Sequence, residues 1–149
     1  MSDADLIKLY SGRILELAAD IPLTDRLANP QATVRKRSPL CGSTVTVDLA
    51  LGNGRIVEYG QDVKACALGQ AAASVVGRVI LGRTRAEVET ARDQLAAMLK
   101  SDGPVPDAPF DGLEVLLPAR DFKNRHASIL LTLDAASEAM AQAEKSACA

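Results

Sequence analysis

The fold of this chain is decided by one stretch, Pro39 to Ser74, which reads PLCGSTVTVDLALGNGRIVEYGQDVKACALGQAAAS. Residues 44–51 alternate between apolar and polar side chains, and residues 55–64 alternate again, as the two faces of a β-strand require. Between the two runs lies Gly52-Asn53-Gly54, a strong hairpin signal because asparagine and glycine adopt the positive φ angles of a tight turn. The stretch therefore predicts an antiparallel hairpin.

Two registers are open to this hairpin, and they differ by one residue. A two-residue turn at Asn53-Gly54 sets the first register. The shifted register matches Val47 with Tyr59. It also matches Leu49 with Val57, so that apolar side chains meet on one face of the sheet. Because register follows the apolar face, we expect the shifted pairing, reached through a three-residue loop or a bulge.

Both registers bring two cysteines to the open end of the hairpin. Cys41 precedes the first strand and Cys66 follows the second, so we expect them on neighbouring strands roughly 5 Å apart. Thiols so placed can share a metal, form a disulfide or pack as small apolar groups. Cys66 also precedes a predicted helix, whose partial positive charge favours the thiolate that attacks sulfur and binds metals. Gly42, next to Cys41, permits close approach of a backbone or a ligand.

The rest of the chain is mostly helical by the spacing of its apolar residues. The predicted helices cover residues 5–19, the segment between Cys66 and Gly82, a segment that begins with a capping box at Thr84 and Glu87, and residues 121–144. A proline-containing loop occupies residues 101–109. A short strand over residues 32–36 carries charges that suit the edge of a sheet. The predicted fold class is α+β, a three-stranded antiparallel sheet with helices packed on one face.

Composition narrows the class of protein. The 149 residues fit a single domain, residues 1–149, with a real core. A net charge of −2 and the absence of tryptophan argue against a nucleic-acid surface. Without a run of about 20 apolar residues or a signal peptide, we expect a cytoplasmic protein that does not bind a membrane. Three cysteines do not make a disulfide framework, so we expect free thiols.

The order of these features resembles the NifU-like scaffold family of iron–sulfur cluster assembly, which includes IscU and SufU. The first matching pieces are a helix with Tyr10, an Asn29-Pro30 step, Cys41-Gly42 opening a hairpin, and Cys66 leading into a helix of small residues. The last is similar to the SufU motif Phe-x-x-Arg-x-x-Cys-x-x-Leu, and its residues here are Phe122, Arg125, Ser128 and Leu131. The resemblance implies a SufE/NifU-like fold and the SufU-like branch.

The resemblance also implies a ligand set, which in the family is three cysteines and an aspartate. Cys41 and Cys66 match two of the cysteines, and Ser43 stands where the family has aspartate. In a SufU-like register Ser128 occupies the third cysteine position, whereas an IscU-like register matches His126-Ala127 to a His-Cys pair. The cofactor ligands implied in this way are Cys41 and Cys66, and the further metal candidates are His126, Ser128 and Ser43.

The function implied by the resemblance is that of a carrier rather than an enzyme: a scaffold that receives sulfur from a cysteine desulfurase, or a zinc-bound acceptor of persulfide sulfur. The implied cofactor is an iron–sulfur cluster, iron or zinc, and the implied partners are the desulfurase and other iron–sulfur assembly proteins. Two alternatives stay open. One is a degenerate paralogue that acts as a metal-free interaction module, which Ser43 and Ser128 favour. The other is a thiol enzyme or redox switch that uses Cys41 and Cys66.

Overall fold

The computed structural model describes residues 11–39 and 42–148. Tyr10 and Cys41, both used in the resemblance above, lie outside these ranges. In chain order the elements are helix α2 (Gly12–Ala19), strands β1 (Ala32–Arg37), β2 (Thr44–Gly52) and β3 (Arg55–Lys64), helices α3 (Ala67–Val79) and α4 (Arg85–Lys100), the 3₁₀ helices η1 (Phe110–Asp121) and η2 (Lys123–Arg125), and helix α5 (His126–Cys148).

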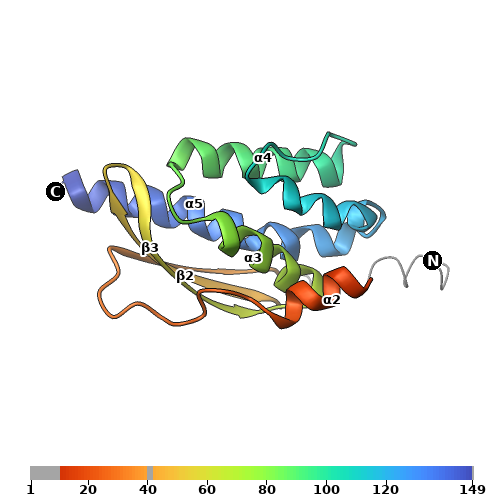
Figure 1. The fold of residues 1–149 in the computed structure, drawn as a ribbon, viewed down its shortest axis with the longest axis horizontal. Coiled ribbons are helices and arrows are strands. Elements are labelled where there is room, and N and C mark those ends of the chain that lie inside the picture. Colours follow the sequence, from red (N-terminus) through yellow and green to blue (C-terminus); the bar gives the residue numbers. More distant parts are fainter. Residues whose placement is uncertain (1–10, 40–41, 149) are drawn as a thin grey trace.

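The strands form one antiparallel sheet in the order β1-β2-β3, and helices cover one of its faces (Figure 1). Helix α5 packs along β1 and β2, α3 lies against α5, and α4 forms an outer layer on α5. This arrangement confirms the α+β class, the three-stranded sheet and the edge position of β1. Within the described ranges, no helix is long and apolar enough to cross a bilayer.

The core lies between the sheet and these helices. Val45, Val47 and Leu49 face it from β2, and Ile129 and Leu133 meet them from α5, each at most 1% exposed. Burying one such side chain stabilises the fold by about 1.5–3 kcal/mol relative to leaving it in water. The period-two pattern of β2 thus gives the buried face that the sequence predicts.

The hairpin has the two-residue turn at Asn53-Gly54, the shorter of the two turns considered above. Asn53 and Gly54 have φ angles of 55° and 78°, as a two-residue turn with positive φ at both central positions requires. Gly52 pairs with Arg55 directly across the turn. The tip of the hairpin therefore follows the register that the turn sequence sets.

The register away from the turn differs from the one we expected. A bulge does occur, next to Leu51, but it lies on β3 and shifts the pairing in the opposite direction. Leu49 pairs with Tyr59, so the expected pairs Val47–Tyr59 and Leu49–Val57 are wrong. Val57 is the extra residue and is 56% exposed. With Val57 turned out, Ile56 and Tyr59 on either side of it both reach the core, which is the packing that the predicted register could not provide.

The start of the last helix is also later than expected. Residues 110–125 form two 3₁₀ segments, and α5 begins at His126 rather than near residue 121. Pro118 lies inside η1, and a proline lacks the N–H that a regular α-helix needs there.

The capping box at α4 is confirmed, because the Thr84 hydroxyl accepts from the Glu87 N–H and the Glu87 carboxylate accepts from the Thr84 N–H.

The opposite face of the sheet is covered at Asp48 by the segment between α2 and β1. Asp48 is fully buried, and its carboxylate accepts hydrogen bonds from the Arg26 guanidinium, the Leu27 N–H at 3.2 Å and the Thr33 hydroxyl at 2.6 Å. Burial alone would raise the pKa of Asp48, but the bonds from Arg26, Thr33 and Leu27 hold it below its usual range. The sequence placed this residue on the polar face without indicating that the face is covered.

Candidate functional site

The start of α3, the loop before β2 and the first turn of α5 meet at Cys66. Cys66 is the N-cap residue of α3, with φ −66° and ψ 169°, and its side chain makes no capping hydrogen bond. Its thiol is free and the residue is half-buried. The sulfur is therefore held at the positive end of a helix in a residue that is only partly buried.

Two serine hydroxyls lie beside this thiol. The Oγ atom of Ser128, on α5, is 3.5 Å from the Sγ atom of Cys66 and donates a hydrogen bond to the Oγ atom of Ser43 at 3.1 Å. Ser128 is 1% exposed and Ser43 4%. We call Cys66, Ser128 and Ser43 the thiol–hydroxyl cluster. Its members are separated by up to 85 positions in the chain, so only the tertiary fold brings them together.

A close approach of α3 to α5 fixes Ser128 in the cluster. A Cβ atom built on Gly69, in α3, would lie 2.6 Å from the Ser128 Oγ and 2.9 Å from the Ala65 Cβ. Any residue larger than glycine would thus push the two helices apart or displace the hydroxyl. Sequence reasoning recognised the small-residue character of this helix but did not single out Gly69.

The loop before β2 carries the second predicted ligand, Cys41, which lies outside the described residues, so its ligand role stays a prediction. The next residue, Gly42, has a φ of +72°, a left-handed conformation that glycine adopts without strain. Its N–H donates to the Ser38 carbonyl at 2.9 Å, which closes the turn between β1 and β2. The Arg37 guanidinium lies 4.0 Å from the position that a Cβ of Gly42 would take. A positive charge therefore stands beside this loop.

His126 belongs to a different part of the molecule. Its Nε2 atom is 2.9 Å from the Ala119 carbonyl oxygen, and the residue is 4% exposed. Its ring lines a separate pocket, whereas Ser128, two positions on and about 200° around the helix, faces Cys66. The structure therefore brings Cys66, Ser128 and Ser43 together and does not bring His126 to them. The pairing of Ser128 with Cys66 fits the SufU-like register.

The described donors do not suit the metal that the resemblance implies. Zinc and iron–sulfur clusters prefer thiolates and imidazoles, usually four ligands in all, and a neutral hydroxyl is a poor substitute. The cluster offers one thiol and two hydroxyls. Across residues 11–39 and 42–148, no group of three or more His, Cys, Asp or Glu side chains could hold a metal ion. The metal roles predicted for Cys41, Cys66, His126, Ser128 and Ser43 stay predictions.

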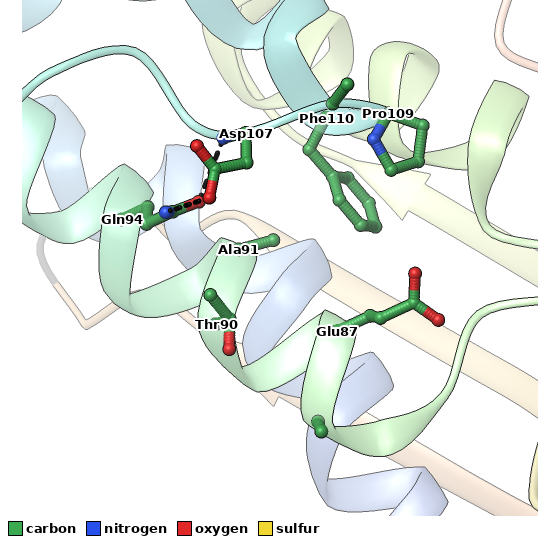
Figure 2. Close-up of a pocket in the computed structure, with 9 residues that line it drawn as sticks. Glu87, Thr90, Ala91, Gln94, Asp107, Pro109 and Phe110 are labelled. Atoms are coloured by element: carbon green, nitrogen blue, oxygen red, sulfur yellow. Dashed lines mark hydrogen bonds between the residues drawn. The ribbon is translucent and has the colours of Figure 1, made fainter.

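A pocket of about 250 Å³ lies between α4 and the segment before η1 (Figure 2). Ala91 and Phe110 form its apolar wall, and two hydrogen bonds of 2.9 and 3.0 Å join Gln94 to Asp107. It shares no residue with the thiol–hydroxyl cluster. Because the amide of Gln94 is already bonded to Asp107, we assign this pocket no role in chemistry.

Comparison with known proteins gives matches among solved structures. No family model matches the chain, and no curated protein sequence matches it. One match is the crystal structure of the N-terminal part of a nitrogen-fixing NifU-like protein from Brucella abortus. Its sequence is 43% identical, and the TM-score is 0.92 over 95% of this chain and 98% of that one.

Two more distant structures share the fold alone. One, from Fervidobacterium islandicum AW-1, is described as a candidate iron–sulfur cluster assembly scaffold protein for the SUF system; it is 19% identical, with a TM-score of 0.79 over 90% of this chain and 98% of that one. The other, a hypothetical protein, is 17% identical with a TM-score of 0.77 over 91% and 98% of the two chains.

Proposed function

The chain belongs to the NifU-like family of iron–sulfur cluster assembly scaffolds, and on that premise we propose that it acts in cluster assembly as a sulfur acceptor, with Cys66 as the receiving thiol. The observation that carries the proposal is the half-buried Cys66 thiol at the N-cap of α3, with its sulfur 3.5 Å from the buried Ser128 hydroxyl. We propose Cys41 as the second thiol of the same site. A resident metal has less support, because serines stand at positions 43 and 128.

The proposed donor is a protein persulfide of the kind that a cysteine desulfurase forms. The Cys66 thiolate attacks the terminal sulfur of that persulfide, and a new S–S bond forms. The S–S bond of the donor breaks, and its electron pair leaves with the donor cysteine, which becomes a thiolate. One sulfur atom moves to Cys66 without any net oxidation or reduction, so the step needs no further reactant.

The surroundings of Cys66 suit this step. The partial positive charge at the start of α3 stabilises an anionic sulfur, both before the attack and in the persulfide product. The Ser128 hydroxyl lies within hydrogen-bonding distance of the sulfur. The exposed Arg37 adds positive charge at the neighbouring loop. Cys66 is only partly buried, as access by a partner persulfide requires.

The test is transfer of sulfur from a cysteine desulfurase supplied with L-cysteine. Intact-mass and peptide mass spectrometry should show one added sulfur atom on Cys66, lost in Cys66→Ala and retained in Cys148→Ala. A Cys41→Ala variant reports the contribution of the second thiol. Sulfur that persists on the Cys66→Ala variant at the wild-type level would show that another thiol is the acceptor.

Metal and labile-sulfide analysis of anaerobically purified protein separates this role from that of a metal-binding scaffold. Stoichiometric iron with labile sulfide that depends on Cys66 would favour the scaffold over the acceptor. A metal-free interaction module is the second candidate, because the cluster has serines at the two positions that the resemblance assigns to family ligands. That candidate predicts unchanged desulfurase binding in Cys41→Ser with Cys66→Ser and no sulfur on the wild-type protein.

A further inference from the structure

A pocket of about 380 Å³ opens where the end of α4 meets the start of α5. It shares no residue with the thiol–hydroxyl cluster. Its lining residues are Leu99, Lys100, Asp102, Arg120, Asp121, Lys123 and His126. The volume falls in the range of small-molecule sites, and the residues come from α4, the loop that follows it, η1, η2 and α5. The proposed function uses none of these side chains.

The wall of this pocket contains an unused hydrogen-bond acceptor. A carbonyl oxygen can only accept, so the contact between His126 and Ala119 places the imidazole proton on Nε2. When the ring carries this single proton, Nδ1 has a lone pair. In the part of the chain that the structure describes, Nδ1 makes no hydrogen bond, and it is not one of the fully buried polar atoms that lack a partner, so a ligand in the pocket can reach it. A ligand that suits this atom must bring an O–H or N–H donor.

The rim of the pocket is rich in positive charge. Lys100 and Lys123 are exposed and form no ion pair with any other described residue. Arg120 is held in place, because its guanidinium donates to the carbonyls of Met98 and Gly103 at 2.6 Å each. The pocket also lies at the N-terminal end of α5, a helix of 23 residues, which adds partial positive charge.

Two carboxylates share the rim with these three cations. Asp102 lies 3.7 Å from Arg120 and offsets part of its charge. Asp121 is exposed and forms no ion pair in the described ranges. The lining therefore keeps one net positive charge, placed mainly on the two lysines, and an acceptor on His126. A ligand with negative charge at one end and a hydroxyl at the other matches both features.

We propose that this pocket binds a small oxyanion that also carries an O–H group, either a hydroxycarboxylate or a protonated phosphate. The charged oxygens pair with Lys100 and Lys123, and the ligand hydroxyl donates to Nδ1 of His126. The two lysines supply most of the affinity, because charge-assisted contacts are the stronger ones. His126 supplies selectivity, because an analogue without the hydroxyl leaves Nδ1 unpaired.

His126 is the only histidine in the chain, so the imidazole signals in the NMR spectrum of untagged protein belong to it. The probes are malate, succinate, which lacks the hydroxyl of malate, and inorganic phosphate, each titrated at one fixed pH in a buffer free of oxyanions. Malate should shift the Nδ1 signal saturably and bind about three to ten times more tightly than succinate. Phosphate that binds more tightly than malate would identify phosphate as the source of the oxyanion.

Variants test the lysines against a matched control. Lys100→Ala with Lys123→Ala should weaken malate or phosphate binding at least about tenfold, and both side chains are exposed, so the fold should persist. Lys145→Ala, an exposed lysine at the other end of α5, should leave binding unchanged. The proposal is overturned by the absence of saturable shifts with malate and phosphate, by succinate binding as tight as malate, or by equal losses in the control.

Discussion

Two polar clusters lie in different parts of the fold, one around Asp48 in strand β2 and one around Cys66 where α3 and α5 begin. The Asp48 carboxylate is fully buried and accepts four hydrogen bonds, two of them from Arg26. The Cys66 thiol is half-buried and has one described hydrogen-bonding neighbour, at 3.5 Å. A saturated buried charge holds the chain in one arrangement, whereas a thiol with a single weak contact keeps its lone pairs for chemistry.

The largest expected effect comes from giving the thiol–hydroxyl cluster the metal-binding side chains that it lacks. Ser43→Asp with Ser128→Cys places a carboxylate and a thiol in the thiol–hydroxyl cluster, at the positions that the resemblance assigns to family ligands. With Cys41, the set becomes three thiols and a carboxylate, which suits zinc. We expect about one zinc per chain in the purified variant, measured by elemental analysis.

The matched control for this variant adds Cys66→Ala, which should remove the zinc again. If Ser43→Asp with Ser128→Cys purifies without metal, the thiol–hydroxyl cluster lacks the geometry of the family site. The Asp48 cluster and the thiol–hydroxyl cluster would then differ in shape rather than in residue type.

The next largest effect is a loss of folding stability when the Asp48 cluster is changed. Asp48→Asn removes the charge from a buried group with four hydrogen bonds. Breaking a buried pair costs about 3–5 kcal/mol, and we expect about 2–3 kcal/mol here, because Arg26 is half-exposed and can return to water. Urea denaturation measures this loss. A change within about 0.5 kcal/mol would show that the Asp48 cluster adds no more than an exposed pair does.

The same carboxylate gives stability a defined pH dependence. The pKa of Asp48 is lower in the folded chain than its ordinary value of about 4. The unfolded chain therefore takes up the proton first as pH falls, so the contribution of Asp48 is fully present above about pH 4 and is lost as pH falls through the folded pKa. We expect the stability difference between wild type and Asp48→Asn to narrow between about pH 7 and about pH 3. A stability difference that stays constant over this pH range would contradict the lowered pKa of Asp48 in the folded chain.

A smaller loss of stability is expected at Gly69, where α3 packs against the thiol–hydroxyl cluster. Gly69→Ala places a methyl group 2.6 Å from the Ser128 Oγ, and we expect a loss of about 1–2 kcal/mol in urea denaturation. Ser128→Ala removes the oxygen that the methyl group meets. The double variant should therefore lose less than the sum of the two single variants. Simple additivity would mean that the close approach to Ala65 causes the whole loss.

The smallest effect should follow from an exposed ion pair between β1 and α5. Lys36 Nζ lies 2.6 Å from a Glu138 carboxylate oxygen, and both side chains are more than 40% exposed. Lys36→Ala should cost no more than about 0.5 kcal/mol, and less at high salt. A cost close to that of Asp48→Asn would remove the distinction between buried and exposed charge on which the comparison of the clusters rests.

Local sequence was enough for the strands and their order and for most of the helices, but not for the 3₁₀ segments before α5. Alternation predicted β2 and β3 with ends within one residue of those observed, because strand periodicity depends only on backbone geometry. The positive φ angles of Asn53 and Gly54 and the capping box at Thr84 are likewise properties of a few neighbouring residues. Resemblance to a family added the prediction that Ser43 and Ser128 stand at ligand positions, and the family itself is confirmed.

Tertiary packing alone decided the rest. The bulge at Val57 was set by the need to bury Ile56 and Tyr59 together, and the choice of Ser128 over His126 as the neighbour of Cys66 was set by how α5 rotates against α3. Each of these outcomes depends on contacts between residues far apart in the chain. Local patterns fix dihedral angles and faces, but the long-range fit of side-chain volumes selects among arrangements that those patterns leave equal.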